Sequence, residues 1–147
     1  VGTFKHGNIH EDAAGDWAML MELNALSALR LSEAVLPAMR AQSYGRIVHV
    51  AAGAGARAFA GAGVYSASKA AVMRITEAIS EENKALGITA NCIMPGTIDT
   101  PQNRAAMPNA DHSTWVQPAD VAAVVAFLLS RSAQALTGAA VPVTGRQ

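Results

Sequence analysis

The sequence predicts an α/β protein with a small parallel sheet. Segments with helical periodicity alternate with short apolar segments, in the order helix, strand, helix, strand, helix, strand. Chains that alternate in this way form parallel strands joined by right-handed crossovers. At 147 residues, the chain is long enough for one domain with a substantial core. We therefore expect a single domain over residues 1–147, with one edge of its sheet left open.

Helices are expected where apolar residues recur at helical spacing, and buried strands where apolar and β-branched residues run together. The expected helices cover residues 11–40, 64–85 and 117–129. The expected strands cover residues 46–51, 88–94 and 140–143, and the first of them is expected to be buried on both faces. Pro37 is expected to kink or break the first helix near its end. The Gly/Ala-rich run before residue 64 is expected to be a loop, and residues 95–109 a functional loop or lid.

Composition and charge exclude several classes of protein. Lys+Arg and Asp+Glu are 11 each, so the chain lacks the basic excess of a nucleic-acid-binding protein. No apolar run approaches the ~18 residues that span a bilayer, and no signal-peptide pattern is visible. The single cysteine, Cys92, lies in an apolar run, which predicts a buried, inert thiol in a reducing, cytoplasmic compartment. The four histidines and this cysteine show no metal-ligand spacing.

Tyr65 and Lys69 are the strongest candidates for chemistry. Because they are four residues apart on an expected helix, their side chains share one face, one turn apart. A free phenol titrates near pH ~10, and a nearby ammonium favours the phenolate, so the tyrosine can exchange a proton closer to neutrality. The ammonium is also suited to binding hydroxyl groups of a ligand. The alternative is an exposed helix pair with the tyrosine packed on a neighbour.

Asn24 lies on the apolar stripe of the first expected helix. A buried amide needs hydrogen-bond partners, and leaving it without them costs roughly 1–3 kcal/mol. Two interpretations are equally open from the residues: nearby backbone satisfies the amide, or the amide belongs to a site.

Together these residues resemble the C-terminal half of a short-chain dehydrogenase/reductase, and the match covers nearly the whole chain. The family's Asn-Ser-Tyr-Lys catalytic set has the spacing of Asn24, Ala52, Tyr65 and Lys69, and its Pro-Gly turn matches residues 95–96. The resemblance implies the C-terminal part of a doubly wound parallel-sheet Rossmann fold that lacks the N-terminal dinucleotide-binding strands. Residues 98–115 look like the corresponding loop of dihydropteridine reductases, in which Asp-Thr-Pro-x-Asn-Arg-x-x-Met-Pro-x-Ala-Asp-x-Ser-x-Trp follows the same strand.

The resemblance implies a role for each matching catalytic position. Tyr65 would be the proton donor, Lys69 would lower its pKa and hold the nicotinamide ribose, and Asn24 would anchor a water in the proton relay. Ala52 stands where most of the family has serine, whose hydroxyl polarises a substrate carbonyl. Alanine donates no hydrogen bond, so Ala52 favours a quinonoid dihydropteridine as substrate, or an inactive protein, over ordinary ketone reduction.

The cofactor implied by the resemblance is NAD or NADP. Backbone at Pro95, Gly96 and Ile98 would meet the nicotinamide amide, and Thr100 would lie near the cofactor phosphates. The Gly-rich turn that holds the pyrophosphate at a helix N-terminus is absent from the sequence, so tight binding of the cofactor by this chain is not expected. The chain also begins Val-Gly-Thr without methionine, which is expected of a fragment or a processed product.

Two classes of function follow. The first is an oxidoreductase that passes a hydride from a nicotinamide cofactor to a small organic substrate; a carbonyl or 3-oxoacyl reductase is its variant, disfavoured by Ala52. The second is a non-catalytic interaction module. In the resembled family two long helices pack against their copies, so the helices over 11–40 and 64–85 would form a homodimer or homotetramer.

Overall fold

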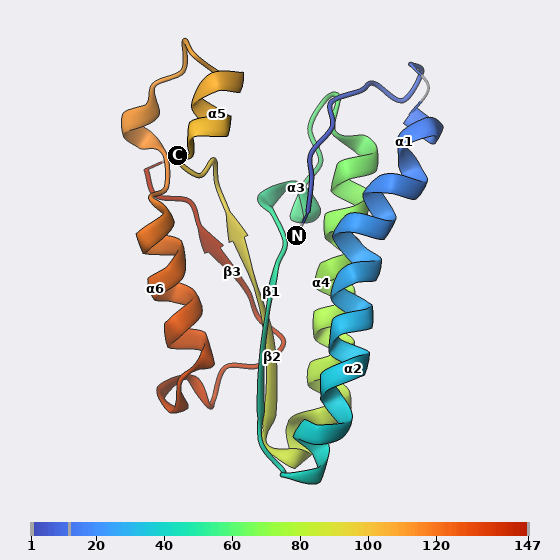
Figure 1. Cartoon of the computed structure of the whole chain (residues 1–147), viewed down its shortest axis with the longest axis vertical. Helices are drawn as coiled ribbons and strands as arrows, with labels where there is room; N and C mark the ends of the chain where they lie inside the picture. The colour runs from blue at the N-terminus through green and yellow to red at the C-terminus, as the bar shows by residue number, and fades with distance from the viewer. Residues whose placement is uncertain (1, 12, 147) are drawn as a thin grey trace.

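The computed structural model describes residues 2–11 and 13–146 and contains one parallel sheet (Figure 1). Its strands are β1 (Gly45–Val50), β2 (Ile88–Pro95) and β3 (Ala140–Val143), in the spatial order β1-β2-β3. All three predicted strands are confirmed, with bounds that differ by a residue or less. Because both pairings are parallel, the carboxyl ends of the strands meet at one edge of the sheet.

Helices cover both faces of the sheet (Figure 1). One face carries α1 (Ala13–Leu20), a π-helical segment (Met21–Leu26), α2 (Ser27–Ala41), and α4 (Gly63–Asn83) with its 3₁₀ extension (Lys84–Leu86). The other face carries α6 (Pro118–Leu129). The three long predicted helices are therefore confirmed, and Pro37 lies inside α2 without ending it. Pro37 removes a bond to the carbonyl of Glu33, and both residues are exposed, so water can solvate that carbonyl.

Adjacent residues of β2 build the two halves of the core, because side chains of a strand alternate between faces. Cys92 packs with Val72 and Met73 of α4. Ile93 packs with Val116 and with Leu128 of α6. Cys92 is buried, as predicted, and burial raises the pKa of its thiol. The inertness of this thiol stays a prediction.

The two crossovers of the sheet have opposite hands. The chain moves in the same direction across the sheet from β1 to β2 and from β2 to β3. However, α4, the helix of the first crossover, lies on one face of the sheet, and α6, the helix of the second, lies on the other. The prediction that every crossover is right-handed is therefore wrong for one of them. The long connection through residues 96–117 allows the chain to pass round the carboxyl edge before α6 begins.

Three further predictions need correction. β1 is not buried on both faces: buried residues alternate with half-buried ones and the last residue, Val50, is exposed, because β1 is an edge strand that α6 covers only in part. The Gly/Ala-rich run contains a short helix, α3 (Gly53–Ala56). The loop over 95–109 contains α5 (Pro101–Ala106), which begins with proline at its first position and Thr100 as its N-cap.

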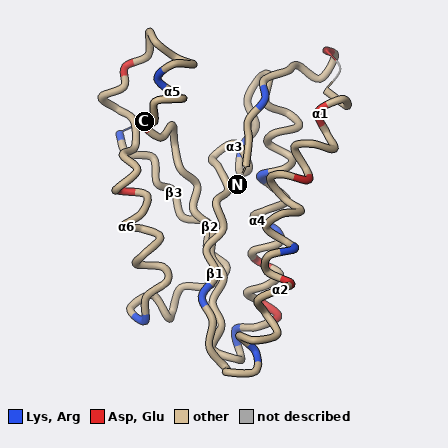
Figure 2. Tube along the Cα trace, in the orientation of Figure 1, with Lys and Arg blue, Asp and Glu red and all other residues tan. Residues whose placement is uncertain are grey.

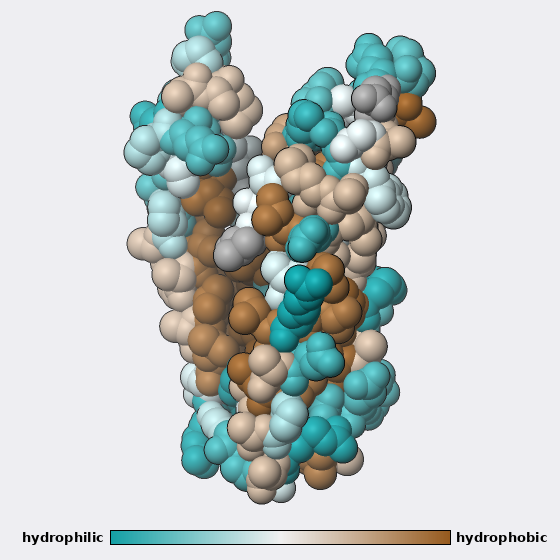
Figure 3. Space-filling model, turned by 45° about the vertical axis from the view of Figure 1, so that its right-hand side comes forward, coloured by the Kyte–Doolittle hydropathy of each residue, from teal (hydrophilic) through white to brown (hydrophobic). Residues whose placement is uncertain are grey.

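Charged and apolar residues are unevenly distributed. Figure 2 shows Lys and Arg both on the upper arms and at the lower end of the molecule, where the strands begin. Figure 3 shows the upper end hollowed between two arms, with hydrophobic residues exposed on the face below it. Among the described residues, no helix has the length and apolar character to cross a membrane. The same residues contain no cluster of three His, Cys, Asp or Glu that could hold a metal ion.

Candidate active site

The carboxyl end of β1 leads directly into the candidate site. Ala52 follows the strand in extended conformation and caps α3, with 9% of its surface exposed. Gly55 of α3 lies against the backbone of α4: an added Cβ would be 2.8 Å from the carbonyl carbon of Lys69 and 3.0 Å from the nitrogen of Ala70. Only glycine allows this approach, which brings Ala52 beside the first turns of α4.

Tyr65 and Lys69 lie in the first two turns of α4, as their spacing predicted. The Nζ of Lys69 donates a hydrogen bond of 3.0 Å to the carbonyl oxygen of Val50, the last residue of β1. It lies 5.9 Å from the centroid of the Tyr65 ring. The lysine is 6% exposed, and its ammonium keeps further donors for a ligand after the bond to Val50. The sequence-predicted pair is therefore brought together at the carboxyl edge of the sheet.

The electrostatics of the pair differ from the sequence prediction. Burial raises the pKa of Tyr65 above its ordinary value. Burial also lowers the pKa of Lys69, because desolvation penalises its charged form. The implied lowering of the tyrosine pKa by Lys69 is thus opposed by the desolvation of both groups.

Asn24 lies beside this pair, in the π-helical segment between α1 and α2. Its Oδ1 accepts a hydrogen bond of 2.8 Å from the Thr3 backbone N–H, and its Nδ2 donates to the Thr3 carbonyl oxygen at 3.0 Å. The Nδ2 also donates to Ser68 Oγ at 2.9 Å. The backbone of Thr3 therefore satisfies this amide, as the first interpretation expected, and the bond to Ser68 ties it to α4. A role of Asn24 in a site stays a prediction.

Gly2 lies between Asn24 and Lys69. A Cβ on Gly2 would be 3.0 Å from Asn24 Oδ1 and 3.5 Å from Lys69 Nζ. Its φ of +149° is in a region that favours glycine. The N-terminal segment therefore passes through the candidate site.

The sequence analysis missed two residues of this arrangement. Ser68 is fully buried and donates a hydrogen bond of 2.7 Å to the Tyr65 carbonyl oxygen while it accepts one from Asn24. Phe4 packs edge-on against the Tyr65 ring, with centroids 4.9 Å apart, and is 51% exposed. The N–H of Gly7 donates to the Gly61 carbonyl oxygen at 2.8 Å and holds the same segment in place. No local pattern marks Phe4, because its partner is 61 positions along the chain.

The predicted cofactor-contacting residues follow β2 at the same edge. Pro95 ends the strand, and the Gly96 N–H donates to the Val143 carbonyl oxygen at 3.0 Å. Asn103 Nδ2 donates to the carbonyl oxygen of Ile98 at 2.7 Å. Thr100 Oγ1 accepts the Asn103 N–H at 3.2 Å as the N-cap of α5. These contacts show that Gly96, Ile98 and Thr100 organise the connection, and the Gly96 N–H is already engaged within the protein.

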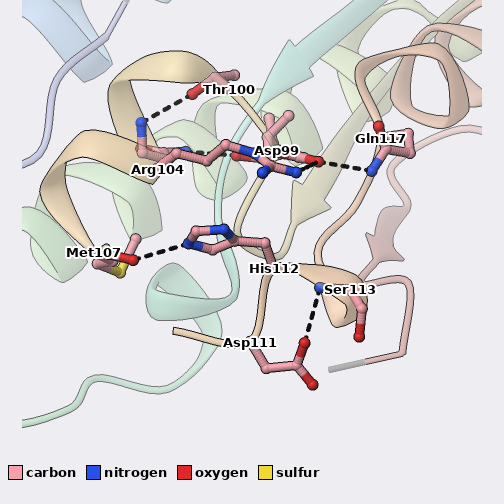
Figure 4. A network of polar contacts seen from close by, with 10 residues as sticks. Asp99, Thr100, Arg104, Met107, Asp111, His112, Ser113 and Gln117 are labelled. Atoms are coloured by element: carbon pink, nitrogen blue, oxygen red, sulfur yellow. Dashed lines mark hydrogen bonds and ion pairs between the residues drawn. The ribbon is translucent and has the colours of Figure 1, made fainter. Parts of the chain in front are cut away.

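A polar network holds α5 to the segment that precedes α6 (Figure 4). Both oxygens of Asp99 accept hydrogen bonds from Arg104, at 2.5 and 2.8 Å, and Gln117 Nε2 donates to Asp99 at 3.0 Å. Hydrogen bonds from Arg104 and Gln117 hold the pKa of Asp99 well below its usual range. Further along, His112 Nε2 contacts the Met107 carbonyl oxygen at 2.9 Å. The connection is therefore tied down by its own side chains.

The donor set fits one end of a nicotinamide dinucleotide. Lys69 supplies free ammonium donors suited to ribose hydroxyls, and within residues 2–11 and 13–146 the Tyr65 hydroxyl has no hydrogen-bond partner. The Gly/Ala-rich run after β1 differs from a pyrophosphate-binding turn, because its helix α3 has only four residues and the chain then leads into α4 with Tyr65. The donors described here are therefore suited to ribose hydroxyls and not to a pyrophosphate.

The chain is similar to known reductases. Residues 1–111 match the family model described as short chain dehydrogenase. The 3-oxoacyl-(acyl-carrier-protein) reductase FabG of Vibrio cholerae is 35% identical over 138 residues, which cover 88% of this chain and 57% of the relative. The acetoacetyl-CoA reductase of Shinella zoogloeoides is 30% identical over 156 residues, which cover 100% of this chain and 65% of the relative.

The fold is also that of a solved structure. A putative gluconate dehydrogenase from Agrobacterium tumefaciens superposes with a TM-score of 0.91 over 98% of this chain and 61% of that chain, at 24% identity. The chain thus spans less than two thirds of the length of these relatives. From the family match and the identity to its relatives, the chain belongs to the short-chain dehydrogenase family.

Proposed function

We propose that this chain is the catalytic part of a nicotinamide-dependent reductase, in which Tyr65 supplies the proton. The observation that carries the proposal is the convergence of Tyr65, Lys69 and Asn24 at the carboxyl edge of β1, where parallel α/β sheets bind their ligands. NAD or NADP would supply the hydride when bound. The Lys69 ammonium would hold the ribose hydroxyls, and Asn24 would fix the N-terminal segment and α4 around the phenol.

The test is the substitution Tyr65→Phe in the full-length parent protein. Loss of the proton donor is expected to lower kcat by about 10²–10⁴. Tyr44→Phe is the matched control, because Tyr44 is exposed and precedes β1 at the opposite edge of the sheet. Normal turnover by Tyr65→Phe would show that this phenol is not the proton donor.

For the substrate, we propose a planar conjugated ring such as a quinonoid dihydropteridine. Ala52 offers no hydrogen-bond donor at the end of β1, and a reducible group within a conjugated ring needs such a donor less than an isolated ketone does. The half-exposed Phe4 ring beside Tyr65 presents an apolar surface on which a planar ring can pack. The likeness of residues 98–115 to the dihydropteridine reductase loop supports the same substrate class.

A 3-oxoacyl substrate is the competing proposal, because two relatives are named as reductases of 3-oxoacyl and acetoacetyl thioesters. Side-by-side assays of the parent protein with a quinonoid dihydropterin and a 3-oxoacyl thioester separate the two. If the substrate is a pterin, the unaltered parent should turn over the pterin faster than the thioester. Ala52→Ser should then gain the ability to reduce the thioester. Faster reduction of the thioester by the unaltered parent would reverse the assignment.

We also propose a second role, in self-association, for the outer surface of α1 and α2. Trp17, Leu31 and Val35 are 51%, 64% and 41% exposed, although they are large apolar residues. A groove of about 500 Å³ beside Trp17 is lined by apolar residues of α1 and by the start of α4. Leu31→Glu is expected to shift a dimer toward monomer in sedimentation, whereas Leu129→Glu on α6 is not. A particle size that Leu31→Glu leaves unchanged would exclude this surface.

A further inference from the structure

A polar cavity lies at the end of the sheet where the strands begin, opposite the end that carries Tyr65. It encloses about 320 Å³ between the start of β1, the end of α4 and the turn after α6. Arg46 is four residues before Val50 in β1, so the cavity is roughly 13 Å along the strand from the Lys69 contact. Its contents would therefore not touch the candidate active site.

The cavity is strongly cationic. Among the described residues that line it, Arg46, Lys84 and Arg131 are basic and none is acidic. The Lys84 ammonium is offset by Glu81 at 2.6 Å. Within residues 2–11 and 13–146, neither arginine forms an ion pair with a carboxylate. Two positive charges are therefore left without a carboxylate partner among the described residues, and Figure 2 shows Lys and Arg at this lower end.

Both guanidinium groups lie close to the Tyr44 ring. Their Cζ atoms lie 4.6 Å and 5.7 Å from the centroid of the Tyr44 ring, with Arg46 the nearer. Arg46 is also anchored by its Nη1, which donates to the carbonyl oxygens of Gly45 and Gly87 at 2.7 and 2.8 Å. Both arginines also line the cavity, so their like charges would be stabilised by an anion bound there. The anchoring means that little ordering is needed when the anion binds.

Polar atoms without partners point to the same place. Arg46 Nε and Thr89 Oγ1 are buried and have no hydrogen-bond partner among the described residues. Arg46 and Thr89 are direct neighbours across β1 and β2, so their side chains lie on the same face of the sheet. Thr89 is 95% buried, since 5% of its surface is exposed, and it lines the cavity. Buried polar groups are normally satisfied, which suggests that a small shift on binding brings these donors to a ligand.

We propose that this cavity binds a phosphate group, carried by inorganic phosphate or by a small phosphate monoester. Two uncompensated positive charges match the charge of about −1.5 to −2 that a phosphate monoester carries at pH 7. The planar guanidinium of Arg131 can bind two phosphate oxygens at once, and the Thr89 hydroxyl supplies a neutral donor. The volume of about 320 Å³ leaves room for a small organic group beside the phosphate.

The experiment is a titration of the ¹⁵N-labelled chain with sodium phosphate and, separately, with glycerol 3-phosphate, at constant ionic strength set by sodium chloride. Saturable shifts are expected for the amides of Arg46, Thr89 and Thr137. Arg131→Gln is expected to weaken binding by about tenfold or more, because it removes a charge-assisted hydrogen bond. Arg30→Gln is the matched control, since it removes the same charge from an exposed site on α2.

Thr89→Val tests the buried hydroxyl at nearly constant shape and is also expected to weaken binding. Saturation by both ligands supports a monoester site, and saturation by inorganic phosphate alone supports a site for the free anion. The proposal would be overturned if the chemical shifts rose without saturation. It would also be overturned if Arg131→Gln and Arg30→Gln reduced the affinity for phosphate equally. All of these readouts are independent of reductase activity, so the outcome stands whether or not the proposed function is correct.

Discussion

Replacing Gly55 by alanine is expected to destabilise the fold, although alanine is the better helix former. Neither Gly53 nor Gly55 of α3 has a positive φ, so alanine is compatible with the backbone at both positions. At Gly55 the new Cβ would be 2.8 Å from the Lys69 carbonyl carbon and 2.9 Å from its oxygen. At Gly53 it would meet nothing within 4 Å. The pair of variants therefore separates steric overlap from helix propensity.

The expected difference follows from the atoms involved. The methyl group of Gly55→Ala would overlap backbone atoms inside α4. Backbone atoms of a helix cannot rotate away as a side chain can. Overpacking of this kind costs about 1–3 kcal/mol. The propensity gain from Gly to Ala is about 0.5–1 kcal/mol and acts in both variants, so the two should differ by about 1–3 kcal/mol. For a chain of this length, that corresponds to a difference in Tm of about 2–12 °C.

Urea unfolding followed by tryptophan fluorescence measures this difference, because Trp115 is 8% exposed in the folded chain. Gly53→Ala should unfold at the same or a higher urea concentration than the unaltered chain, and Gly55→Ala at a lower one. Equal midpoints for the two variants would refute the reasoning, since α3 would then not rest on the backbone of α4 at this distance.

Three further predictions concern hydrogen bonding and pH. Asn24→Ala should lower the free energy of unfolding by about 1–3 kcal/mol in urea titrations, because it leaves the part-buried Thr3 peptide groups without their partner. Asn8→Ala removes an exposed amide bond to Glu11 and should cost less, and equal losses would contradict this account. The NMR signal of the Asp99 carboxyl carbon should not titrate at pH 3–4 in the unaltered chain, because Arg104 holds the pKa of Asp99 down. In Arg104→Gln the same signal should titrate near pH ~4. Identical titration midpoints in the two proteins would disprove the coupling. Burial lowers the pKa of His49, so the unfolded chain binds more protons than the folded chain and stability should fall as the pH drops through about 6.5. Between pH 7.5 and pH 5.5, the urea midpoint should therefore fall less in His49→Gln than in the unaltered chain. The same pH dependence in both proteins would count against His49.

Much of the fold was readable from local patterns. The strands are short β-branched apolar runs, and the long helices show apolar residues at helical spacing, so both are marked by neighbours in the sequence. The proximity of Tyr65 and Lys69 was predictable too, because residues four apart on a helix lie on the same face, one turn apart. The short helices α3 and α5 were missed, because four to six residues carry too little periodicity and depend on caps and contacts instead.

Other features required contacts between distant residues. Lys69 donates to the Val50 carbonyl oxygen, and burial raises the pKa of Tyr65 and lowers the pKa of Lys69, which opposes the expected effect of the lysine on the tyrosine. Phe4 reaches Tyr65 because hydrogen bonds fix its segment on both sides, from Thr3 to Asn24 and from Gly7 to Gly61. The hand of a crossover likewise depends on which face α6 covers, and both faces of β2 are apolar.

The sequence by itself determined the alternation of elements, the family resemblance and the residues available for proton transfer, because these depend on spacing along the chain. The tertiary structure alone decided which groups are desolvated, which donors are already engaged and where unpaired cations gather. Those properties arise when segments far apart in sequence exclude water from one another, and Arg46 beside Thr89 is the clearest example.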